Sequence, residues 1–222
     1  MDIVLNENQE KIFSALFEQV DGVFRLKQNY HREIAFFGGF RSGKSYIMAL
    51  VIYLIAITYK VHIVVLRQTY GELRDSSIVQ FRNDFERFGK FEYKVAARDA
   101  VFGNGSIISF RAYSDDESKI KSSNFDVGLL VQAEELPHPV FLQVLGRLSG
   151  NGIPKPLLLT EGNPSDSWCK ERYVERTSKE IADDGILFIQ GTTYDNQTNI
   201  PKTYIQDLLT QYPQDYIDRY VF

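Results

Sequence analysis

The chain has 222 residues, 44% of them hydrophobic and 24% charged, which is enough for one α/β domain with a sizeable core. Its formal net charge of −4 argues against a protein that coats DNA, although it does not exclude one that touches DNA with a few loops. The single cysteine, Cys169, has no partner for an internal disulfide, so we expect a reducing compartment. The scattered His31, His62 and His138 predict no structural zinc site.

The first residues, MDIVLNENQEKIF, are polar and acidic and do not form a secretory signal peptide. The most apolar stretch, Ile47–Tyr59, is shorter than the roughly 20 residues that a transmembrane helix needs. It therefore predicts a buried helix of an α/β core, and we expect no membrane partner.

Short apolar runs alternate with segments of helical periodicity along the chain. The first helix is predicted over residues 8–20, with Ile12, Phe13, Leu16, Phe17 and Val20 on one face. Buried strands are predicted at residues 33–39, 61–67, 126–131, 156–160 and 185–190. Further helices are predicted at residues 47–59, 78–88, 139–148 and 200–212, and a hairpin around residues 102–106. Such alternation predicts a mostly parallel sheet covered by helices on both faces.

The octapeptide GGFRSGKS, Gly38–Ser45, fits the Walker A pattern G-x-x-x-x-G-K-[ST] of a phosphate-binding loop. The pattern lies between a predicted strand and a predicted helix, so the helix start would face the phosphates. The backbone of Gly38, Gly39, Ser42 and Gly43 would cradle them, because glycines allow close approach.

Two side chains of this loop have expected roles in phosphoryl transfer. Lys44 would bridge the β- and γ-phosphates of ATP, and Ser45 would hold Mg²⁺. Arg41, at a variable position, has two readings: a solvated side chain, or a cation near the γ-phosphate.

A phosphate-loop ATPase also needs a carboxylate at the end of a neighbouring strand. The candidate segment is VGLLVQAEEL, where Gln132 and Ala133 precede Glu134 and Glu135, so the acids come late. Gln132 could replace one acid while Glu134 reaches back, or the strand could shift so that the two glutamates are the pair. A third possibility is that Glu134 and Glu135 have no catalytic role and only stabilise the amino end of a helix. We favour Glu134 as catalytic and metal-binding residue, with Glu135 second.

These motifs together resemble the ATPase domain of the large terminase subunit of tailed bacteriophages, over nearly the whole chain. The similar blocks are NENQEKIF, GGFRSGKS, VVLRQTYGELRDSSIVQF, DDESKIKSSNFDVGLLVQAEEL, LLLTEGNP and TTYDNQTNIPKTYIQDL. The resemblance implies an α/β fold of the P-loop NTPase class (ASCE or RecA-like) that hydrolyses ATP with Mg²⁺ to drive double-stranded DNA into a procapsid.

The resemblance also implies residue roles. Gln9 would lie on the adenine side of the nucleotide. Thr160 and Asn163, in the coupling motif, would sense loss of the γ-phosphate. An arginine finger from a neighbouring subunit is expected, but the matching region offers only Lys119 and Lys121, with Arg111 nearby. A lysine can stabilise charge but lacks the planar, two-pronged guanidinium of arginine. Lys119, Lys121 and Arg111 therefore all stay candidates for the trans-acting cation.

Partners and location follow from the same resemblance. We expect double-stranded DNA, the phage portal protein, the small terminase subunit, and a homo-oligomeric ring, pentameric when packaging, with a monomer in isolation. The location would be the host bacterial cytoplasm, with transient residence at the procapsid portal and none in the mature virion. Residues 1–222 would be one ATPase domain of a longer subunit whose nuclease domain lies elsewhere.

Three other functions compete with this interpretation. A helicase or repair ATPase would need a second motor domain, for which the chain has no room. A small-molecule kinase would need a lid segment, and none is evident. A non-enzymatic nucleotide-binding regulator is suggested by Gln132 at the place of an acid.

Overall fold

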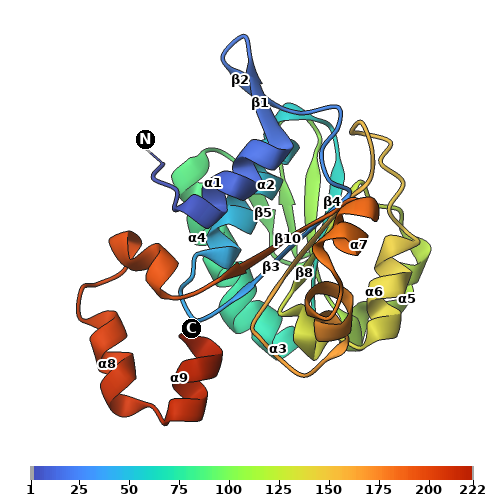
Figure 1. The fold of residues 1–222 in the computed structure, drawn as a ribbon. Coiled ribbons are helices and arrows are strands. Elements are labelled where there is room, and N and C mark those ends of the chain that lie inside the picture. Colours follow the sequence, from blue (N-terminus) through green and yellow to red (C-terminus); the bar gives the residue numbers. More distant parts are fainter. Residues whose placement is uncertain (1–2, 222) are drawn as a thin grey trace.

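A central sheet organises the computed structural model, which describes residues 3–221 except for the side chain of Lys119 (Figure 1). Its strands are β3 (Glu33–Gly38), β4 (His62–Arg67), β5 (Glu92–Lys94), β6 (Asp99–Val101), β7 (Ile107–Ala112), β8 (Val127–Val131), β9 (Leu157–Gly162) and β10 (Ile186–Gly191). Their order in the sheet is β10-β3-β9-β8-β4-β7-β6-β5. The strands from β10 through β7 run parallel, and β6 and β5 extend this edge antiparallel, which confirms the predicted mostly parallel sheet.

Helices cover both faces of this sheet (Figure 1). They are α1 (Glu7–Leu16), α2 (Lys44–Thr58), α3 (Tyr70–Glu72), α4 (Val79–Phe88), α5 (Tyr113–Ser122), α6 (His138–Leu145), α7 (Ser178–Asp183), α8 (Tyr204–Gln211) and α9 (Gln214–Tyr220). Helices α1, α2 and α4 share one hydrophobic cluster with the sheet, and α5, α6 and α7 share a second one on the opposite face. The last two helices, α8 and α9, form an arm beside the sheet.

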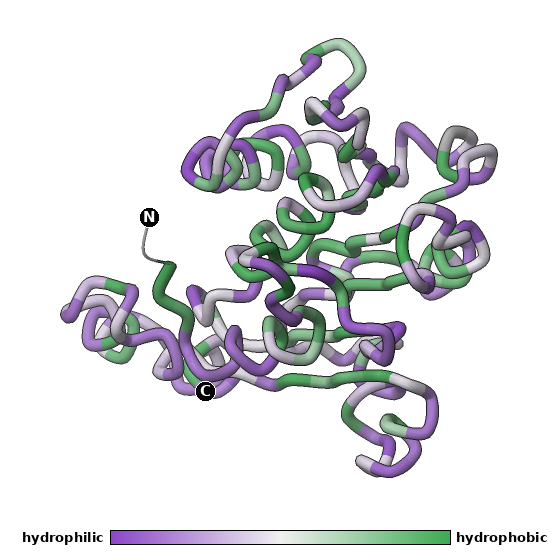
Figure 2. The backbone as a smooth tube through the Cα atoms, turned by 90° about the horizontal axis from the view of Figure 1, so that it is seen from above, coloured by the Kyte–Doolittle hydropathy of each residue, from purple (hydrophilic) through white to green (hydrophobic). Residues whose placement is uncertain are grey.

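Burial on both faces explains why the strands were readable from sequence. Every residue of β3, β8 and β9 is buried, so each strand is a largely apolar run. Helix α2 is apolar around most of its circumference because it lies between the sheet and the helices α1 and α4. Figure 2 shows hydrophobic residues gathered in the central strands and α2, and hydrophilic ones in the outer helices and loops. No helix within residues 3–221 has the length and apolar character that crossing a bilayer would require.

The predicted first helix was too long. It ends at Leu16, and Phe17–Val20 instead forms strand β1, which pairs antiparallel with β2 (Val23–Leu26). Asp21 and Gly22 join the two strands with φ of 51° and 78°. An Asp-Gly pair in this left-handed conformation matches the twist of a two-residue hairpin, so the turn overrides the helical periodicity.

The order of the parallel strands determines where a site can form. Strand β9 lies between β3 and β8, so the segments that follow these three strands meet at one edge of the sheet. The phosphate loop follows β3, Asn163 follows β9, and Gln132 follows β8. In parallel α/β sheets, ligands bind at this carboxyl edge.

Candidate functional site

The predicted phosphate loop connects β3 to α2. Gly38 is the last residue of β3, Lys44 is the first residue of α2, and Gly43 caps the helix in a left-handed conformation with φ of 91°. A side chain at Gly43 would also overlap the amide of Gln9. Both constraints require glycine here, and the 15-residue helix directs its amino end toward the loop.

The ammonium group of Lys44 lies inside this loop. It donates hydrogen bonds to the carbonyl oxygens of Gly38 (2.8 Å) and Gly39 (2.9 Å), and to Oδ1 of Asn163 (3.2 Å). Burial lowers the pKa of Lys44 from its ordinary value, against the opposing attraction of nearby glutamates. The lysine therefore links the phosphate loop to the segment after β9.

Gln9, predicted on the adenine side, is in direct contact with the loop. Its side chain donates to the carbonyl oxygen of Gly43 (2.9 Å) and accepts from the backbone of Asn6 (2.9 Å), and only 2% of the residue is exposed. Beside it lies a cavity of about 400 Å³, whose lining includes Val4, Tyr46 and Asn196. The geometry is compatible with the predicted role, which stays a prediction.

A second cavity, of about 450 Å³, lies over the loop itself. Arg41–Tyr46 form one side of it, and Gln80, Asn196 and Asn199 contribute from other elements. Gly43, Tyr46, Asn196 and Asn199 line both cavities, so the two adjoin. Volumes of this order suit a small organic ligand. Asn196, which was not predicted from the sequence, donates its amide to the carbonyl oxygen of Arg41 (2.7 Å).

The side chain of Arg41 is exposed and lies over the ring of Tyr204 on α8, with its guanidinium carbon 4.8 Å from the ring centroid. Its φ of 53° is left-handed, which is uncommon for a residue with a side chain. The role of Arg41 near the γ-phosphate stays a prediction.

The arm α8–α9 also touches the loop at Phe40. The Phe40 ring stacks on Tyr220 with centroids 4.6 Å apart and an interplanar angle of 1°, and its N–H donates to the Tyr220 carbonyl (2.7 Å). Thr193 donates to the carbonyl oxygen of Phe40 (2.7 Å). A side chain at Gly39 would overlap the Tyr220 carbonyl, which explains a glycine at this variable position of the motif.

Of the two late acids, Glu134 belongs to the site. Its Oε1 accepts hydrogen bonds from the backbone N–H (3.0 Å) and the side-chain amide (3.2 Å) of Asn163. Its Oε2 is buried and has no hydrogen-bond partner among the described residues. Burial raises the pKa of Glu134 above its ordinary value. Asn163 therefore bridges the carboxylate of Glu134 and the ammonium of Lys44.

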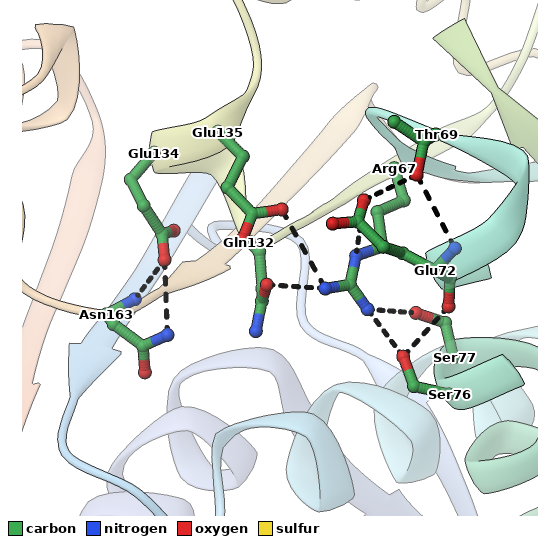
Figure 3. Close-up of polar contacts among 9 residues, drawn as sticks. All are labelled: Arg67, Thr69, Glu72, Ser76, Ser77, Gln132, Glu134, Glu135 and Asn163. Atoms are coloured by element: carbon green, nitrogen blue, oxygen red, sulfur yellow. Dashed lines mark hydrogen bonds and ion pairs between the residues drawn. The ribbon is translucent and has the colours of Figure 1, made fainter. Parts of the chain in front are cut away.

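Glu135 and Gln132 point away from that bridge, toward Arg67 at the end of β4 (Figure 3). The guanidinium of Arg67 donates to Oε1 of Gln132 (2.6 Å) and lies 3.7 Å from Glu135. Glu135 is exposed, and partial burial raises its pKa. This geometry favours Glu134 over Glu135 as the acid of the site.

A further carboxylate, Glu161 on β9, was missed by the sequence reasoning. Ser45, the predicted Mg²⁺ ligand, donates a hydrogen bond to its Oε2 (3.1 Å). Burial raises the pKa of Glu161. The sequence did contain a signal for it, because Glu161 is a charged residue at the end of an apolar strand, between the predicted coupling residues Thr160 and Asn163.

The neighbouring Thr160 faces the other side of β9. It is fully buried, and its hydroxyl lies 3.4 Å from the hydroxyl of Tyr173. Ser42 is also fully buried, and its hydroxyl has no hydrogen-bond partner within the described part of the chain. The coupling roles of Thr160 and Asn163 stay predictions, although only Asn163 of the two has contacts to both Lys44 and Glu134.

Two of the three candidate trans-acting cations have acidic partners within this chain. Arg111 donates to Asp99 (2.8 Å) at the edge of the sheet, and Lys121 pairs with Glu117 on the same helix. The side chain of Lys119 lies outside the described residues. The trans-acting role of all three stays a prediction.

Replacing Gly162 by alanine tests whether the position of Glu134 matters. A Cβ at residue 162 would overlap Oε2 of Glu134 and the ring of Phe37. We expect ATP turnover to fall about tenfold to a hundredfold, with nucleotide affinity retained, because small misplacements of a catalytic group are costly. Gly71→Ala is the matched control, since nothing lies within 4 Å of a Cβ there. Equal turnover in the two variants contradicts the expectation.

Comparison with known proteins identifies the family. A family model described as phage terminase large subunit matches residues 30–221. The PBSX phage terminase large subunit of Bacillus subtilis (strain 168) is 27% identical over 216 residues, covering 88% of this chain and 49% of that protein.

Solved structures have the same fold. The large terminase of a thermophilic bacteriophage matches with a TM-score of 0.81 and 16% identity, over 99% of this chain and 53% of that one. The same large terminase has also been solved with ADP and with ATPγS. The ATPase domain of the Thermus phage P74-26 large terminase matches with a TM-score of 0.63 and 12% identity, over 86% of this chain and 87% of that one.

These likenesses confirm the predicted P-loop α/β fold of the ASCE class. The chain spans about half the length of the PBSX terminase and of the thermophilic bacteriophage terminase. With a family model that matches most of its residues, the chain belongs to the phage terminase large subunit family.

Proposed function

We propose that this chain is the ATP-hydrolysing motor domain of a terminase large subunit that packages double-stranded DNA into a procapsid. The observation that carries the proposal is the hydrogen-bonded bridge from Lys44 through Asn163 to Glu134. It joins a phosphate-directed cation to a carboxylate next to the loop, as ATP hydrolysis requires. The large terminase of the thermophilic bacteriophage, whose fold is shared, binds ADP and ATPγS.

The residues of the bridge have distinct parts in the reaction. Lys44, with the backbone of the loop, neutralises the β- and γ-phosphates while water attacks the γ-phosphorus and the bond to ADP breaks. Glu134 orients the water and accepts its proton. Asn163 contacts both groups, so a change at the phosphates alters the hydrogen bonds of the acid. This supports its predicted coupling role.

The donor groups of the site fit Mg²⁺. A serine hydroxyl and a buried carboxylate, Ser45 and Glu161, are hard oxygen donors next to the phosphate cavity, and Mg²⁺ is commonly held by one or two carboxylates together with substrate phosphates. When bound with ATP, the ion supplies charge neutralisation at the phosphate oxygens.

The partners proposed for the full-length subunit are double-stranded DNA, the portal protein, the small terminase subunit and further copies in a ring. The ring would complete the site with a cation from the neighbouring subunit. The proposed location is the host bacterial cytoplasm, with transient binding at the portal.

A packaging assay tests the function. The full-length subunit is mixed with portal-bearing procapsids, linear double-stranded DNA, the small subunit and Mg²⁺, and DNA protected from DNase is measured. We expect protection with ATP and none with ADP, because translocation requires hydrolysis. ATP consumption without protected DNA contradicts packaging but not hydrolysis, whereas no ATP consumption under any condition contradicts both.

A further inference from the structure

The residue after β8, Gln132, has its side-chain oxygen bound by an arginine. Gln132 has a left-handed backbone with φ of 49°, and its side-chain oxygen accepts from Arg67 at 2.6 Å. In Figure 3 Gln132 and Glu135 both reach toward Arg67, whereas Glu134 reaches toward Asn163. An acid at position 132 would pair with this arginine. The end of β8 therefore lacks a carboxylate at the place where phosphate-loop ATPases hold their metal.

The arginine is held firmly on its other sides. The same guanidinium donates to the hydroxyls of Ser76 and Ser77 in the π-helical segment Leu73–Ile78, and it lies 3.8 Å from Glu72. Arg67 is only 8% exposed. Because Arg67 is held in place, its hydrogen bond also fixes the side-chain oxygen of Gln132.

The neighbouring strand supplies a carboxylate instead. Glu161 lies on β9, between the loop-bearing strand β3 and β8, in register with Phe36 of β3 and Val131 of β8. It is thus level with the last residue of β8 but one strand nearer to the phosphate loop. Ser45 donates to its Oε2 at 3.1 Å.

This carboxylate is buried without a paired cation. Glu161 is 2% exposed. Within residues 3–221, none of the described lysine or arginine side chains lies close enough to form an ion pair with it. The charge of Lys44 attracts Glu161 from farther away, while the ammonium itself donates to Gly38, Gly39 and Asn163. A buried carboxylate is costly unless a positive charge compensates it. Its only hydrogen-bond donor among the described side chains is Ser45, the predicted metal ligand.

We propose that Glu161 is the magnesium-directed carboxylate of this site, in place of an acid at the end of β8. With Ser45 it holds the ion that accompanies the nucleotide, and Glu134 is left to orient water. This inference rests on the proposed function and replaces the predicted metal role of Glu134.

Nucleotide binding with and without metal tests the assignment. ATPγS is titrated into the full-length subunit by calorimetry, once in Mg²⁺ and once in EDTA, for the wild type, Glu161→Gln and Glu134→Gln. The metal enhancement of affinity should fall about tenfold or more in Glu161→Gln, because loss of a metal contact has effects of this size. Glu134→Gln, the matched carboxylate-to-amide control, should keep the enhancement.

The titration in EDTA tests the assignment in a second way, through the affinity for ATPγS without metal. Glu161→Gln should bind ATPγS in EDTA as tightly as the wild type or more tightly, because a buried anion near the phosphates is removed. A merely structural role would instead weaken binding under both conditions and lower the unfolding temperature, measured by circular dichroism. Retained metal enhancement in Glu161→Gln, or its loss in Glu134→Gln, overturns the proposal. If the wild type binds no nucleotide, the proposed function itself fails.

Discussion

Replacing Lys44 by alanine is expected to lower ATP turnover at least about a hundredfold, because removal of one preorganised charge contact to a transferring phosphoryl group has an effect of this size. The side chain is buried inside the loop and contacts Gly38, Gly39 and Asn163, so its removal takes away the charge that lies within the loop. Steady-state phosphate release by the full-length subunit measures the effect.

Two further variants make the Lys44 result decisive. Lys44→Met keeps the aliphatic stem and removes only the charge, so it should lose as much activity while retaining the fold. Lys94→Ala, at an exposed lysine on the edge strand β5, should keep full turnover. Unchanged turnover in Lys44→Ala would mean that the phosphate loop is not the site of hydrolysis.

The second large effect distinguishes the roles of Glu134 and Glu135 in ATP cleavage. Glu134→Gln should lower the rate of ATP cleavage about a hundredfold or more, since general base catalysis contributes factors of this order. Glu135→Gln should lower it less than about tenfold, because Glu135 is exposed and its pair with Arg67 is the kind of ion pair that contributes little. Single-turnover cleavage of radiolabelled ATP measures the chemical step directly.

Nucleotide binding is the control for the pair of acids. Glu134→Gln should bind ADP with wild-type affinity, since Glu134 contacts Asn163 rather than the loop. Equal and mild losses in the two variants would exclude Glu134 as the catalytic base. A larger loss in Glu135→Gln would transfer the role to that residue.

Much of the fold was predictable because buried parallel strands leave a simple pattern. The runs at β3, β4, β8, β9 and β10 are largely apolar, since helices cover both faces. The hairpin β1–β2 was missed because the helical spacing of apolar residues continued through Phe17 and Val20. The Asp21-Gly22 pair between two valines was the contrary signal, and local turn chemistry prevailed.

Site residues could be predicted where the chemistry restricts the residue type. They could not be predicted where their contacts depend on which strands are neighbours in the sheet. Glycines and a lysine are required near phosphates, so GGFRSGKS could be interpreted from sequence alone. Thr160 and Glu161 are adjacent on one strand and face opposite sides, and only the position of β9 beside β3 shows that Glu161 meets Ser45. The contact of Gln132 with Arg67 depends likewise on the neighbouring strand β4.

The stacking of Phe40 on Tyr220 has a mechanical consequence. The loop backbone and the last turn of α9 share a hydrogen bond and two parallel rings, and Gly39 leaves no gap between them. Because these contacts leave little free space, a rotation of the loop at Phe40 would be passed on to the carboxyl end of α9. The phosphate loop would thus have a direct contact to the arm α8–α9, in addition to the contact of Lys44 with Asn163.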